Sequence, residues 1–132
     1  MDLNTFMKAY SSEIGGEFSE YDSDKSIIIM PLPDERFQTV LGHKKHLDRY
    51  EKLVIEFSSK VCAFDDNIDL KMLLEENTNF CHAKFVLVDG FIKVEASCFV
   101  ESATEELLKE ILQEVANLAD NFEFELTGVD VH

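Results

Sequence analysis

Positive charge is the scarcest property of this sequence of 132 residues. Twelve Lys and Arg residues stand against twenty-seven Asp and Glu residues, which gives a formal net charge of −15 at pH 7. Such a field repels the phosphate backbone of nucleic acids and anionic lipid surfaces. We therefore expect neither nucleic acid nor membrane as a partner, and we expect the charge to serve solubility first and encounter with a protein second.

Cysteine and long apolar runs are also scarce. Cys62, Cys81 and Cys98 are odd in number and widely spaced, which predicts reduced thiols rather than a disulfide framework. No apolar run approaches the roughly 20 residues that span a bilayer. The first residues, Met1 to Asn4, show no basic segment followed by an apolar block. The expected location is the cytoplasm.

Apolar residues are plentiful despite the charge. They make up 45% of the sequence, and eleven of them are Phe, which excludes a disordered acidic chain. The length suits one domain whose core is large enough to be stable without disulfide bonds. No linker-like segment interrupts the sequence. We predict a single domain over residues 1–132.

The first half predicts a helix followed by extended segments. Apolar residues at three- and four-residue steps predict a helix over 3–14, which the pair Gly15-Gly16 would end. The polar stretch from His43 to Tyr50 is the one basic island, and it suits a connecting loop or the extended end of a hairpin. Alternation and β-branched residues predict strands at 26–32, 36–44 and 52–62, and a fourth is left open at 17–21.

The second half predicts a short helix, a hairpin and a long helix. The short helix begins after Asp65-Asp66-Asn67 and ends at Asn77-Thr78-Asn79. Asp89-Gly90 suits the tight turn of a hairpin between strands at 83–88 and 91–100. Ser102 and Glu105 form a capping-box pattern before a long helix with an apolar stripe that ends near Phe122. The fold class is therefore α+β, an antiparallel sheet of about five strands with helices packed on it, in the order α-β-β-β-α-β-β-α.

Motifs for catalysis, metals or cofactors are weak. His43, His46, Cys81 and His82 are capable metal ligands, but they do not show the paired spacing of a zinc site. Cys81 beside His82 is the least improbable catalytic nucleophile, whereas core packing explains Cys62 and Cys98 better. No glycine-rich phosphate loop is present. We predict no enzyme, no metal and no cofactor.

Interaction surfaces are the remaining class of site. The long helix should present an acidic strip to solvent, because the segment from Glu101 to Glu125 holds eight acids and one base, Lys109. Some of the many Phe side chains should line an exposed apolar patch. The candidate partner-binding residues are Glu101, Glu105, Glu106, Glu110, Glu114, Phe37 and Phe57.

Three segments carry a resemblance to a known family: Leu73 to Asn77, Ala83 to Ala96 and Thr104 to Asp120. A short helix ending in Asn, a hairpin with Asp-Gly and a helix ending in Ala-Asp together resemble the YbjN-type and Tir chaperone-like family, whose bacterial members share the fold of type III secretion chaperones. The resemblance implies a non-enzymatic α+β domain, often dimeric, whose secretion-chaperone members bind an extended protein segment on apolar patches. It assigns no functional residue to this chain.

Two functions therefore compete. The first is a chaperone-like protein-binding module that holds a segment of an unknown protein partner or its own second copy, so that a homodimer is expected. The second is an immunity or inhibitor protein that presents the acidic helix to a basic toxin. A third alternative is an enzyme that acts through Cys81 and His82 or through a pair of carboxylates in a cleft.

Overall fold

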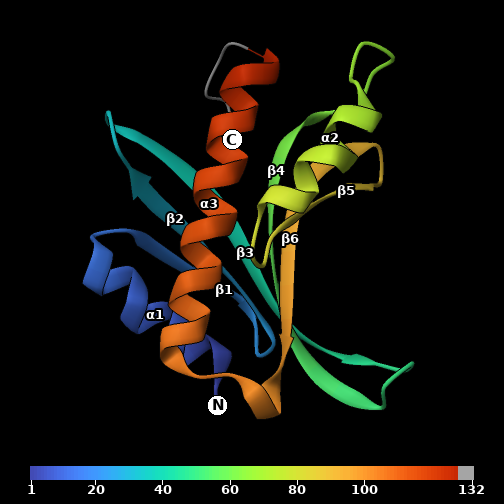
Figure 1. The fold of residues 1–132 in the computed structure, drawn as a ribbon. Coiled ribbons are helices and arrows are strands. Elements are labelled where there is room, and N and C mark those ends of the chain that lie inside the picture. Colours follow the sequence, from blue (N-terminus) through green and yellow to red (C-terminus); the bar gives the residue numbers. More distant parts are fainter. Residues whose placement is uncertain (128–132) are drawn as a thin grey trace.

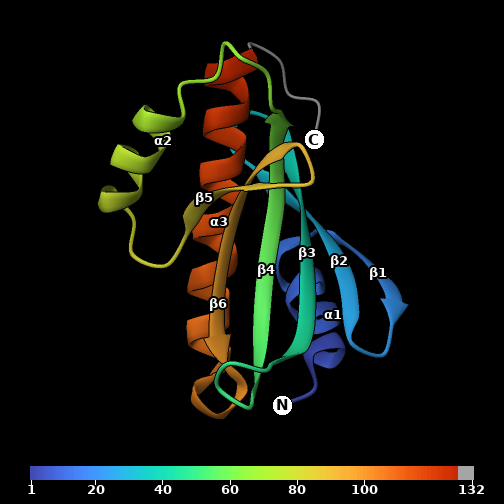
Figure 2. The ribbon, with the colours of Figure 1, turned by 90° about the vertical axis from the view of Figure 1, so that its right-hand side faces the viewer.

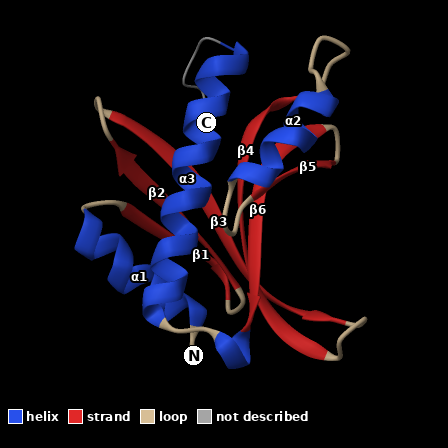
Figure 3. Cartoon of the chain, in the orientation of Figure 1, coloured by secondary structure: helices blue, strands red, loops and turns tan. Residues whose placement is uncertain are grey.

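The computed structural model describes residues 1–127 and consists of one sheet and the helices that cover it (Figures 1 and 3). Short 3-10 turns follow α2 and precede α3. The helices and strands, in chain order, are α1 Leu3–Ile14, β1 Glu17–Asp22, β2 Lys25–Leu32, β3 Arg36–Leu47, β4 Lys52–Ala63, α2 Leu70–Glu76, β5 Lys84–Val88, β6 Phe91–Phe99 and α3 Glu105–Thr127.

The predicted α+β class is confirmed, with one strand more than expected. The sheet has six strands in the order β1-β2-β3-β4-β6-β5, and each neighbouring pair is antiparallel. The strand left open at 17–21 forms β1 at one edge. The basic island is the extended hairpin end, because β3 continues to Leu47 before the chain turns back into β4.

All three helices lie on the same face of the sheet, as Figure 2 shows. Strand residues alternate between this face and the other, so Ile28 and Met30 of β2 are fully buried, whereas Ile27 and Ile29 point to the open face. One apolar cluster fills the space between sheet and helices. No helix within residues 1–127 lies on the opposite face.

The sheet splits between its third and fourth strands. The ladder joins β3 to β4 only from Leu41 to Leu47, opposite Lys52 to Ser58. Beyond it the strands diverge, and the second half of α3 lies over the gap (Figure 1). Side chains bridge the split: the Ser59 hydroxyl donates to the Thr39 carbonyl at 2.6 Å, and Gln38 Nε2 donates to Ser59 Oγ at 2.9 Å.

Most helices and strands end where the sequence predicts. Gly15 adopts a left-handed conformation with φ 72° and closes α1, and Asp89 and Gly90 both have positive φ in the β5–β6 turn. The predicted cap at Ser102 is wrong. Ser102 ends a 3-10 turn and Ala103 is extended, so Thr104 caps α3 instead, and its Oγ1 accepts from the Leu107 amide at 3.1 Å. None of the described helices is long and apolar enough to cross a membrane.

Candidate protein-binding surfaces

A groove of about 470 Å³ runs over the split on the open face of the sheet. Phe37, whose exposed fraction is 52%, is its largest apolar side chain, and the hydroxyls of Thr39, Ser58 and Ser59 make part of the lining polar. This size is within the range of small binding sites. The full lining is Ile27, Phe37, Thr39, Leu41, Ser58, Ser59, Lys60 and Lys93.

A second apolar surface, the α2–β5 patch, is formed by Leu70 and Leu74 of α2 and Leu87 of β5. These leucines are 38%, 68% and 48% exposed and border a hollow of about 150 Å³. Asn77, at the end of α2, holds the helix against the strand: its Oδ1 accepts from the Phe85 amide at 2.7 Å, and its Nδ2 donates to the Phe85 carbonyl. Clustered leucines of this kind are typical of a protein contact.

The two Phe candidates have opposite environments. Phe37 lies on the open face, in the groove. Phe57 is 0% exposed and packs in the core below the helices, so it offers no surface to a partner and leaves the candidate set. Phe57 faces the helices because it is paired with Gly42, a residue of β3 that faces them too. Phe37, also on β3, is an odd number of residues from Gly42 and therefore faces the open side of the sheet.

The acidic strip is shorter than the sequence predicts. Asp120 and Glu123 are buried, so the second half of α3 presents few acids to solvent. Glu101 lies before α3, in the 3-10 turn, and forms a salt bridge with Lys52 at 2.6 Å. Glu105 and Glu106 are exposed in the first turn, where they complement the helix dipole. The immunity-protein alternative therefore loses part of the surface on which it depends.

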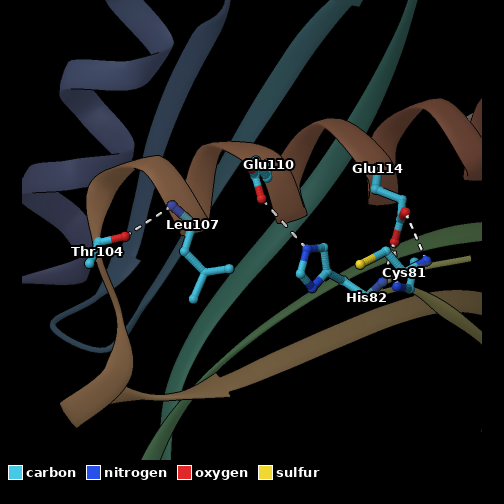
Figure 4. A network of polar contacts seen from close by, with 7 residues as sticks. Cys81, His82, Thr104, Leu107, Glu110 and Glu114 are labelled. Atoms are coloured by element: carbon cyan, nitrogen blue, oxygen red, sulfur yellow. Dashed lines mark hydrogen bonds and ion pairs between the residues drawn. The ribbon is translucent and has the colours of Figure 1, made fainter.

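Glu114 anchors a loop rather than facing solvent (Figure 4). Its carboxylate accepts hydrogen bonds from three consecutive backbone amides, those of Cys81 at 3.2 Å, His82 at 2.7 Å and Ala83 at 2.6 Å. Burial alone would raise the pKa of Glu114, but these hydrogen bonds outweigh it and hold the pKa below its ordinary value of 4.5. One turn earlier on the helix, Glu110 lies 3.7 Å from His82 Nε2.

We expect Glu114→Gln to lower the free energy of unfolding by about 1–2 kcal/mol at pH 7, because the amide cannot accept three backbone donors as an ionised carboxylate does. Since the pKa is lowered on folding, this contribution is present above pH 4.5 and is lost as the pH falls below it. Urea unfolding at a series of pH values measures the difference. The exposed Glu106→Gln is the control, and a pH-independent difference would contradict the assignment.

The chemically reactive candidates do not converge. Cys81 and His82 lie next to α3, with their backbone amides bound to Glu114, while His43 and His46 lie on β3. Within residues 1–127, no three His, Cys, Asp or Glu side chains are grouped as metal ligands. Burial raises the pKa of the Cys62 and Cys98 thiols, which favours the unreactive thiol form.

Comparison with known proteins gives a match in fold only. No family model matches the sequence, and no curated protein is found as a relative. A chain in the crystal structure of the ExsC–ExsE complex matches with a TM-score of 0.61 and 18% identity, over 93% of this chain and 95% of that chain. At this identity the likeness shows that the two chains share a fold.

Proposed function

We propose that the protein is a cytoplasmic, non-enzymatic domain that holds a segment of a partner protein, in the manner of a chaperone. The carrying observation is the groove: all helices cover one face of the sheet, and the other face leaves Phe37 half exposed beside Ile27 and Leu41. A groove with an apolar part on a sheet face suits an extended segment, whose alternate side chains enter it. The fold match supports this role, since ExsC and ExsE form a complex.

We expect Phe37→Asp to abolish capture of the partner without unfolding the protein, because it replaces the largest apolar side chain of the groove, against which the bound segment packs, with a short charged one. The full chain, wild type or variant, is used as bait in extracts of its source cells, and bound proteins are quantified by mass spectrometry. Tyr21→Asp is the matched control, since Tyr21 is 74% exposed and lies outside the groove. Equal capture by both variants would count against the groove.

The α2–β5 patch forms a homodimer contact in this proposal. The exposure of Leu74 and Leu87 on adjacent elements favours it, because two copies related by a two-fold axis would bury the same leucines on each side. We expect light scattering to give twice the 15.1 kDa chain mass for the wild type and one chain mass for Leu74→Asp. Leu53→Asp, an equally polar change at the exposed β3–β4 hairpin end, should stay dimeric. A monomeric wild type would refute the dimer but not the groove.

A further inference from the structure

The open face of the sheet is richer in positive charge than the rest of the chain. Strand register assigns five lysines to it, against the four acids Glu17, Asp22, Glu56 and Glu95. This contrasts with the net charge of −15 for the whole chain. The five lysines are Lys25, Lys45, Lys60, Lys84 and Lys93.

Two of these lysines stand directly opposite each other at the groove. Lys60 of β4 pairs with Lys93 of β6, and like charges in this position are destabilising. Neither makes a salt bridge with any described residue; Lys60 Nζ lies 4.3 Å from the centre of the Phe91 ring. By contrast, Lys45 on the same face is paired with Glu56 at 2.9 Å. Among the residues that the structure describes, those that line the groove include no acid.

The strand edges beside the groove define the shape of an occupant. From Arg36 to Val40, β3 has a ladder partner only in β2, and from Ser59 to Ala63, β4 has one only in β6. The groove lies over this split, where backbone edges of β3 and β4 have no ladder partner across it, and such edges suit an extended chain better than a helix.

We propose that the groove binds an extended protein segment that combines apolar side chains with at least one Asp or Glu. The apolar side chains pack against Ile27, Phe37 and Leu41, and the carboxylate lies between the ammonium groups of Lys60 and Lys93. This inference rests on the proposed function and adds the chemistry of the partner. Long polyanions fit less well, because the remaining charge of the chain repels them.

The test selects peptides from a random-peptide display library on the immobilised full chain. We expect the selected peptides to alternate apolar residues with Asp or Glu. Synthetic copies should bind K60E/K93E at least about tenfold more weakly by fluorescence anisotropy. The control is K8E/K71E, which changes exposed lysines on α1 and α2. Each double variant replaces two positive charges with two negative ones and lowers the net charge from −15 to −19, so a long-range effect would weaken binding to both equally.

The outcomes separate the inference from the function. Selected peptides that lack acids, or that bind K60E/K93E and the wild type equally, would overturn the inference and leave a peptide-binding function. No selection above the blank surface would overturn the inference, while the capture experiment with Phe37→Asp decides the function independently. Full displacement by heparin would mark a general polyanion site. If the wild type were a dimer and only K60E/K93E disrupted it, the groove would be a contact between two copies of the chain. Displacement by heparin or disruption of such a dimer would each reject the proposal.

Discussion

Replacing Phe57 with alanine is expected to lower the free energy of unfolding by about 4 kcal/mol, the range for a buried Phe that leaves a cavity. Phe57 is 0% exposed and lies in the centre of the sheet, between β3 and β6. Its ring lies where a side chain at Gly42 would meet it, and Met7 of α1 closes the same space. Neighbours so closely packed on three elements cannot collapse into the cavity. Urea unfolding followed by circular dichroism measures the loss.

Phe37→Ala is the matched control for this prediction. The substitution is the same, but half of the Phe37 surface is already in water and its neighbours line an open groove, so we expect a loss below about 1 kcal/mol. The effect of Phe37→Ala should instead be on function: the variant should stay folded and capture less of the partner. Equal losses of stability at the two positions would contradict the placement of Phe57 in the core and Phe37 in the groove.

The sequence predicts the local elements of this fold because their signals are local. The Gly15 stop, the Asp89-Gly90 turn and the alternation along β4 each depend on a few neighbouring residues, and each prediction is confirmed. Alternation cannot say which face of a strand the helices cover. That choice separates Phe37 from Phe57, and it depends on how the β3–β4 turn sets the register between Gly42 and Phe57.

The candidate site was less predictable because it depends on contacts between distant segments. Glu114 has the spacing of a solvated helix position, and only the approach of residues 81–83 gives it three backbone donors. Lys60 and Lys93 come together through two strands that are not consecutive, with a register shift just beyond Lys60. Leu70 and Leu74 of the α2–β5 patch have the spacing of a helix that buries them, and only the position of α2 at the sheet edge leaves Leu74 exposed.

Removing the charge of Arg36 is expected to cost about 3 kcal/mol of unfolding free energy. Arg36 of β3 reaches across the split to Asp120 of α3, with Nε and a terminal nitrogen at 2.9 Å and 2.8 Å from the same carboxylate oxygen. The Asp120 side chain is 3% exposed, whereas that of Arg36 is 30% exposed. Arg36→Ala would therefore leave the buried carboxylate of Asp120 without its cation. Removing one partner of a buried ion pair costs more than replacing both, because an uncompensated charge stays buried. Urea unfolding at neutral pH measures this loss.

Three further variants distinguish the pair from simple packing. Asp34→Asn removes the charge of a carboxylate that is 84% exposed and 3.9 Å from Arg36, and Asn tolerates the left-handed φ of 64° at this position, so the effect should stay within about 0.5 kcal/mol. Asp120→Asn keeps an acceptor for the guanidinium and should cost less than Arg36→Ala. The double variant Arg36→Met, Asp120→Leu removes both charges and should recover much of the loss, because no unpaired charge stays buried. If the double variant were no more stable than Arg36→Ala, the cost would come from lost contacts of the Arg36 side chain, such as its approach to the Phe124 ring at 5.9 Å, and not from the carboxylate it neutralises.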